Sequence, residues 1–170
     1  MHRILHPTVM VASLLLALGH AALGAELNPT LSDAHGNTRG GTNALPSSTG
    51  SHNTAFGNDA LRNNTGHSNT ASGLSALYSN TTGHSNTAFG VRALYRNTIG
   101  GGNTASGVYA LYSNTTGNYN TALGWDALLS NTTGFSNTAS GDNALYNNTT
   151  GYYKPANGTN ALYNNTAGNS

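Results

Sequence analysis

Hydrophobic and polar residues recur along most of the chain with a fixed period of 16 or 17 residues. The repeated unit follows the pattern N-T-A-x-G-x-x-A-L-Y-x-N-T-T-G-x-x, whose positions are numbered 1 to 17 here. Its eight copies begin at Asn37, Asn53, Asn69, Asn86, Asn103, Asn120, Asn137 and Lys154. The first copy is degenerate, and Lys154-Pro155 replaces Asn-Thr in the last. A short fixed period is typical of solenoids and stacked arrays.

Each unit contains two short strand candidates, Thr-Ala-x-Gly at positions 2 to 5 and Ala-Leu-Tyr at positions 8 to 10. Gly at position 5 and Asn-Thr-Thr-Gly at positions 12 to 15 indicate turns. Stacked units place identical residues about 4.8 Å apart, so that Asn and Thr side chains form hydrogen-bonded ladders. The sequence therefore predicts an all-β fold, a parallel β-solenoid or β-roll, with a thin core of Ala at positions 3 and 8 and Leu at position 9.

Position 4 leaves open whether one or two units make a turn of the solenoid. Large and small residues alternate there, as in Phe56, Ser72, Phe89, Ser106 and Leu123. With two units per turn, the large residues stack on one side. With one unit per turn, Ser72 lies between Phe56 and Phe89. Positions 3, 8, 9 and 13 show no such alternation, which favours one unit per turn.

The N-terminus is typical of a cleaved secretory signal peptide, residues 1–25. Arg3 gives a basic start, an apolar run follows from Val9 to Leu18, and small residues surround Ala25. The run is shorter than the ~20 residues that span a bilayer. Residues 26–36 are expected to form an irregular lead segment, and residues 37–170 form the repeat domain. We expect a secreted or cell-surface protein without membrane insertion.

The composition argues against most other functions. Only 6% of the residues are charged, against a usual ~25%, and the formal net charge is +1, so the chain lacks the basic surface that binds nucleic acid. There are no cysteines. The acidic residues are too scattered to form a catalytic pair: Glu26, Asp33, Asp59, Asp126 and Asp142. We expect no enzyme activity, no catalytic or metal-binding residues and no cofactor.

Two columns of stacked side chains are the candidate contact ladders. Position 10 supplies an aromatic ladder of Tyr78, Tyr95, Tyr112, Tyr146 and Tyr163, and position 13 supplies Thr49, Thr65, Thr81, Thr98, Thr115, Thr132, Thr149 and Thr166. Tyrosine offers an apolar ring and a polar tip to a glycan or a protein partner; alternatively, the rings pack against neighbouring coils or chains. Flat Thr arrays resemble the ice-binding faces of antifreeze proteins; alternatively, they make stacking and turn hydrogen bonds. The C-terminal half, with Trp125, Phe135, Tyr152 and Tyr153, is the richer in aromatic residues.

The segment Asn53–Gly57 and its equivalents, followed by A-L-Y-x-N-T-T-G, resemble repeats of bacterial and phage fibrous proteins. The N-T-A-x-G part is similar to head repeats of YadA-like trimeric autotransporter adhesins. The longer form is similar to repeats in tail fibres and surface proteins. This resemblance implies a trimeric parallel β-roll with an adhesive or spacer role outside the cell.

The thin core, the near-zero net charge and a last unit without the polar cap that solenoid ends normally need favour self-association. We expect a homotrimer or an end-to-end filament, with a glycan or a host or matrix surface as a further partner. The sequence thus predicts a secreted structural and adhesive repeat protein that acts as a rigid multivalent binding or spacer rod. The alternatives are an ice-binding solenoid and a tail-fibre-like module.

Overall fold

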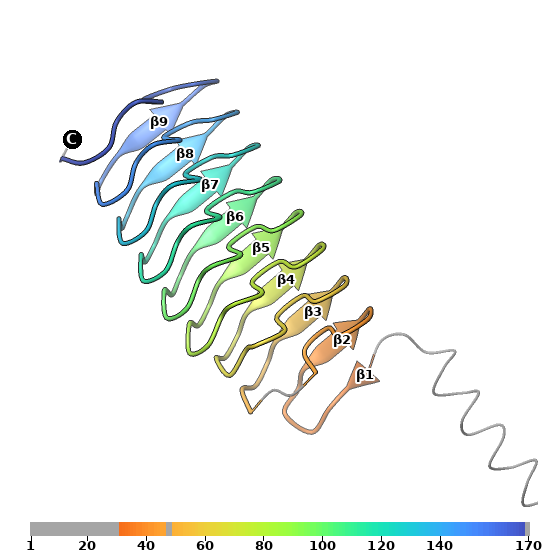
Figure 1. The fold of residues 1–170 in the computed structure, drawn as a ribbon. Coiled ribbons are helices and arrows are strands. Elements are labelled where there is room, and N and C mark those ends of the chain that lie inside the picture. Colours follow the sequence, from red (N-terminus) through yellow and green to blue (C-terminus); the bar gives the residue numbers. More distant parts are fainter. Residues whose placement is uncertain (1–30, 47–48, 169–170) are drawn as a thin grey trace, which may run out of the picture.

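The computed structural model describes residues 31–46 and 49–168, which form a parallel β-solenoid (Figure 1). The proposed signal peptide lies outside the described residues. Each repeat makes one coil, and the coils are numbered 1 to 8 from Asn37. Among the residues that the structure describes, no helix is both long enough and apolar enough to cross a membrane.

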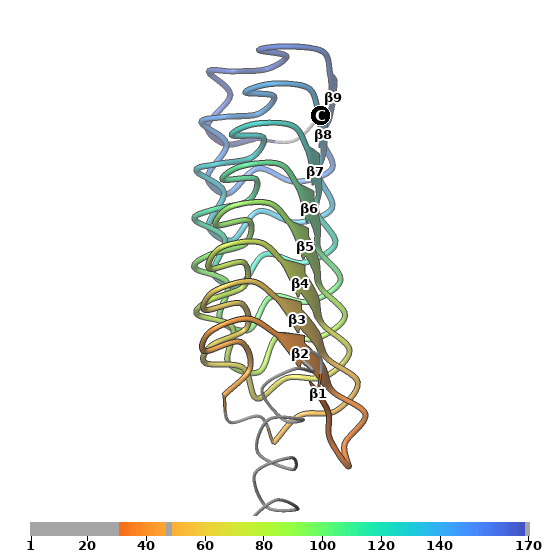
Figure 2. The ribbon, with the colours of Figure 1, turned by 90° about the vertical axis from the view of Figure 1, so that its right-hand side faces the viewer.

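Nine short strands form a single sheet in the order of the sequence. The first strand, β1, pairs antiparallel with β2, and all later neighbours are parallel. Figure 2 shows the strands stacked along one side of the rod and the turns along the other. From β2 onward each strand occupies positions 2 to 4 of its repeat. The strands are β1 Leu31–Ser32, β2 Thr38–Gly40, β3 Thr54–Phe56, β4 Thr70–Ser72, β5 Thr87–Phe89, β6 Thr104–Ser106, β7 Thr121–Leu123, β8 Thr138–Ser140 and β9 Pro155–Asn157.

The strand register shows that one repeat makes one turn. Ser72 of β4 pairs with Phe56 of β3 on one side and with Phe89 of β5 on the other. The small residue therefore separates the two large ones along one column. This arrangement confirms one unit per turn and excludes the two-unit turn.

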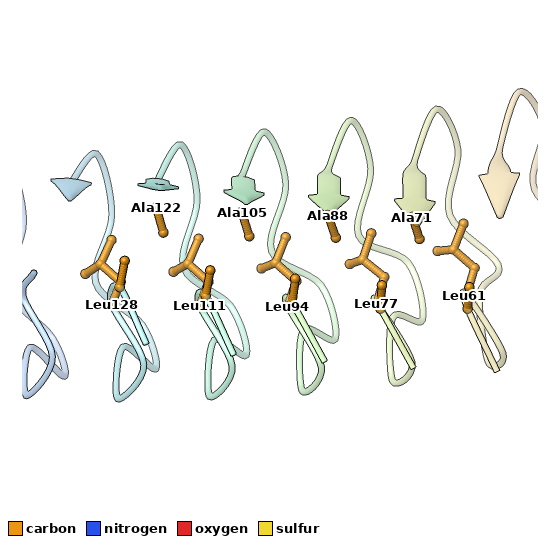
Figure 3. Packing of buried hydrophobic residues seen from close by; sticks show 14 of the residues in the cluster. Leu61, Ala71, Leu77, Ala88, Leu94, Ala105, Leu111, Ala122 and Leu128 are labelled. Atoms are coloured by element: carbon orange, nitrogen blue, oxygen red, sulfur yellow. The ribbon is translucent and has the colours of Figure 1, made fainter. Parts of the chain in front are cut away.

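The core is a narrow column of small and medium side chains, as predicted. In coils 2 to 7, Ala at positions 3 and 8 and Leu at position 9 are 0% exposed. In Figure 3 the Ala side chains point from the strands toward the Leu side chains of the opposite wall. Because side chains alternate along a strand, Ala at position 3 faces inward while positions 2 and 4 face outward.

The prediction of a second strand at Ala-Leu-Tyr is wrong. These residues lie in turns, and the Leu at position 9, which is buried in coils 1 to 7, has φ between 44° and 54° in every coil. Position 7 also has positive φ, between 53° and 57°. Two left-handed residues so close together bend the chain sharply and aim Leu inward. Each costs on the order of 1 kcal/mol of backbone strain, which burial of the Leu side chain offsets.

The prediction of an irregular lead segment over residues 26–36 is wrong for part of its length. Leu31–Ser32 forms strand β1, which pairs with Arg39 and Thr38 of β2. A turn from Asp33 to Gly36 follows, closed by a hydrogen bond from Gly36 N to Asp33 O of 3.0 Å. The segment thus covers the first strand of the solenoid.

Buried asparagines join each coil to the next, as the predicted ladders require. At position 1, Asn103 Nδ2 donates to Asn86 Oδ1 at 3.1 Å and to Gly117 O of its own coil at 2.8 Å. At position 12, Asn114 Nδ2 donates to Asn97 Oδ1 at 2.7 Å and to Gly117 O at 3.0 Å. These amides satisfy the backbone carbonyls of the turns inside the rod, where water does not reach.

Candidate contact surfaces

The tyrosines of position 10 stack on one another along the outside of the rod. Ring centroids lie 5.2 Å apart for Tyr78 and Tyr95, 5.3 Å for Tyr95 and Tyr112, and 4.9 Å for Tyr146 and Tyr163. Leu129 occupies the position between Tyr112 and Tyr146. Because the rings stack nearly parallel, their faces largely cover each other. The geometry therefore favours packing between neighbouring coils over stacking on a bound sugar.

Two arginines reinforce the tyrosine column. The guanidinium of Arg92 lies over the ring of Tyr95, 5.6 Å from its centroid, and that of Arg96 lies over Tyr112 at 5.3 Å. Both contacts fall within the range of a cation–π attraction. The Arg92 contact lies within coil 4, whereas the Arg96 contact joins coil 4 to coil 5.

The threonines of position 13 use their hydroxyl groups within the protein. Each donates its Oγ1 proton to the backbone carbonyl of the equivalent Thr in the following coil, as in Thr98 to Thr115 at 3.0 Å and Thr115 to Thr132 at 3.0 Å. The same bond is made by Thr65, Thr81, Thr132 and Thr149, with Thr166 O as the last acceptor; Thr49 is exposed. Hydroxyls that are bonded to backbone in this way have no proton left for an external ligand.

A strip of exposed apolar side chains runs along the side of the rod, on positions 4 and 6. Position 4 is serine in coils 3, 5 and 7, and position 6 is apolar in coils 3 and 5 but is Asp142 in coil 7. Each coil from 2 to 6 therefore contributes at least one apolar side chain. Its large members are 38% to 58% exposed. We call this surface the apolar strip, and its residues are Phe56, Leu74, Phe89, Val91, Val108, Leu123 and Trp125. The sequence showed the alternation at position 4, but we did not connect it with position 6.

A second aromatic group lies at the corner formed by positions 16 and 17 in coils 6 and 7. Phe135 stacks on Tyr152 at 4.8 Å, and Tyr153 meets both rings edge-on at 5.4 and 5.6 Å. Tyr153 is 60% exposed. This cluster agrees with the aromatic enrichment of the C-terminal half, although no feature of the sequence indicated its edge-on geometry.

Charged groups are sparse over these surfaces. Asp59 forms an ion pair with Arg62, whereas Oδ1 of Asp126 is buried without a hydrogen-bond partner. Burial raises the pKa of Asp126, a hydrogen bond from Trp125 opposes this rise, and the nearby charge of Asp142 adds to it. Among residues 31–46 and 49–168, no three potential metal ligands of the His, Cys, Asp or Glu type come together.

Replacing Asp126 with asparagine is expected to stabilise the protein at neutral pH. The raised pKa means that folding disfavours the ionised carboxylate. The charged form of Asp126 therefore lowers the free energy of unfolding. As the pH falls toward the ordinary value of 3.8, the carboxyl group protonates and the advantage of Asp126→Asn disappears. Asparagine also suits the positive φ of residue 126, because Asn143 and Asn160 have a positive φ at the same position of their repeats, position 7.

Thermal unfolding at neutral and acid pH measures this effect. The control is Asp59→Asn, the same change at the same position in coil 2, where it removes the ion pair with Arg62. Asp59→Asn should not raise the melting temperature at neutral pH. A melting temperature that is unchanged or lower in Asp126→Asn at neutral pH would contradict the account.

Comparison of the chain with protein-family models, with curated proteins and with solved structures finds no match. The function is therefore inferred from the repeat pattern and from the surfaces described above.

Proposed function

We propose that this protein is a non-catalytic extracellular repeat protein, a short rigid rod that associates with copies of itself and presents repeated contact surfaces to an external partner. The observation that carries the proposal is the apolar strip. Contiguous exposed apolar surface on a well-packed protein marks an interaction site. The expected signal peptide and the resemblance to adhesin and tail-fibre repeats support a place outside the cell.

The rod suits such a role because every coil is tied to its neighbours by the same bonds. Eight strands at about 4.8 Å spacing give a stack roughly 34 Å long from β2 to β9. Each coil from 2 to 6 adds at least one apolar side chain to the strip, so weak contacts with a repetitive partner add up through multivalency. The strip carries no charged side chain, which suits apolar contact with a second rod.

Of the alternatives, an ice-binding face receives no support from the threonines of position 13, whose hydroxyl protons bond to backbone carbonyls. A tail-fibre-like module shares the rod and the strip, and differs from the main proposal only in where the rod is displayed.

Charge placed in the apolar strip tests the proposal. The double variant Phe89→Asp with Leu123→Asp is expected to abolish self-association of residues 26–170 in sedimentation equilibrium. The control is Asn63→Asp with Asn118→Asp, which adds the same charge at exposed sites outside the strip. Both proteins should keep the circular dichroism spectrum of the native chain. Self-association that persists in the strip variant would overturn the proposed interface.

A further inference from the structure

The asparagine ladder of position 1 has one polarity along the whole rod. Asn120 donates to Oδ1 of Asn103 through its backbone N at 2.9 Å and through Nδ2 at 3.2 Å. Its own Oδ1 accepts from the backbone N of Asn137 at 3.0 Å. Amide dipoles that point the same way add, as peptide dipoles do in a helix. The ladder therefore has its positive end at coil 1 and its negative end toward coil 8.

Asp33 occupies the positive end of this ladder. Asn37 donates its backbone N–H to Asp33 Oδ1 at 3.0 Å and its Nδ2 to Asp33 Oδ2 at 3.0 Å. The carboxylate thus takes the place of the asparagine that a preceding coil would supply. The side-chain and backbone hydrogen bonds from Asn37 hold the pKa of Asp33 below its ordinary value. Strand β1 covers the edge of β2 beside it.

Lys154 occupies the negative end. Its backbone N donates to Asn137 Oδ1 at 3.1 Å. The backbone N of each ladder asparagine makes the same bond to the residue at position 1 of the preceding coil. Its side chain is only 6% exposed, yet lysine has no acceptor to offer a following coil. The ladder of acceptors stops here, at a residue whose side chain is positively charged.

Pro155 removes the matching backbone donor from the sheet. In each earlier coil the N–H of position 2 donates to the carbonyl of position 1 in the next coil, as Thr121 does to Asn137 and Thr138 to Lys154, both at 2.8 Å. Proline has no N–H and is therefore confined to the edges of sheets. Any strand that pairs beyond β9 loses this bond.

We propose that Asp33 and the pair Lys154-Pro155 are end caps, which close both ends of the rod to a further coil or to a second copy of this chain. Exposed strand edges recruit other chains, and charged residues and proline at an edge prevent this. Closed ends leave side-by-side contact as the route to self-association. The inference rests on the hydrogen bonds of the two ends and stands apart from the proposed function.

An added coil tests the C-terminal cap while coils 1 to 7 stay unchanged. A copy of residues 137–153 is appended after Ser170, both in the native chain and in a variant with Lys154→Asn and Pro155→Thr, which restores the repeat pattern. We expect the backbone amides of the added coil to exchange with deuterium at least about tenfold more slowly in the variant, because only there does the coil pair fully. Equal exchange in the two proteins would overturn the cap.

Moving the cap inward gives an independent test. Asn120→Lys with Thr121→Pro places the same pair in coil 6, where it should separate coils 7 and 8 from the rest. Amides of coils 7 and 8 are then expected to lose protection while those of coils 1 to 4 keep it. The control is Thr133→Lys, an exposed site in coil 6. Native protection in coils 7 and 8 of the cap variant would contradict the inference.

The N-terminal cap is tested at Asp33. Asp33→Asn keeps an acceptor for Asn37, whereas Asp33→Ala removes the acceptor of the Asn37 backbone N–H and one of the two acceptors of its Nδ2, which still donates to Gly50 O. The exchange rate of the Asn37 amide is expected to rise more in Asp33→Ala than in Asp33→Asn. Unchanged exchange in Asp33→Ala would show that this end is not capped by the carboxylate.

Discussion

Replacing Gly107 with alanine is expected to lower the free energy of unfolding by more than about 4 kcal/mol, an effect reached only when packing is severely disrupted. Gly107 is at position 5, where the glycines of successive coils stack with φ between 114° and 145°. A Cβ added to Gly107 lies 2.2 Å from the carbonyl oxygen of Gly124. The Cβ is fixed to the backbone of Gly107, and the atoms that it meets belong to the backbone of Gly124, so the clash is relieved only by separating coils 5 and 6.

Gly158→Ala is the matched control for this prediction. Gly158 has the same position in coil 8 and a φ of 116°, but an added Cβ has nothing within 4 Å. In this variant only backbone strain lowers the free energy of unfolding, by about 1–2 kcal/mol. Denaturant titration of both proteins measures the difference. Should Gly107→Ala be insoluble, amide exchange at coils 5 and 6 replaces the titration. Similar losses in the two variants would show that the stacking of glycines is unimportant.

Asn103→Ala is expected to cost about 3–4 kcal/mol, because removal of a buried partner leaves other polar groups unsatisfied. Asn103 is 0% exposed. Its Oδ1 accepts the backbone N–H and the Nδ2 of Asn120, and its Nδ2 donates to Asn86 and Gly117. Alanine leaves the buried N–H of Asn120 without an acceptor and opens a cavity beside it.

The control for Asn103 is an asparagine on the surface. Asn63 is exposed, and its side chain makes no hydrogen bond within the described part of the chain. Asn63→Ala should change the free energy of unfolding by no more than about 0.5 kcal/mol. The two free energies come from equilibrium unfolding in urea. A loss in Asn103→Ala no larger than that of Asn63→Ala would mean that the ladder contributes little to stability.

Much of this fold could be predicted from the sequence because identical residues must stack in a solenoid. The repeat length, the inward Ala at position 3 and the buried Leu at position 9 followed from periodicity alone. Leu94 shows where this reasoning stops. Local propensity opposes its φ of 53°, and only closure of the coil around the core imposes it.

The surfaces were harder to predict, because the sequence does not reveal how outward side chains orient. For Tyr95 the sequence left open a contact surface or packing against a neighbouring coil, and the structure places its ring between Tyr78 and Tyr112. The hydroxyl of Thr115 turns back to the backbone of Thr132. The role of Asp33 depends on a turn in a segment outside the repeat pattern, so no periodicity indicated it.

The mass and shape of residues 26–170 in solution test the central proposal, a short rod that associates side by side. Sedimentation equilibrium gives the mass, and small-angle X-ray scattering gives the length and the cross-section. The account predicts a small oligomer whose length stays near that of one rod while its cross-section exceeds that of a single coil. A monomer at all concentrations, or a particle that lengthens at constant cross-section, would contradict it.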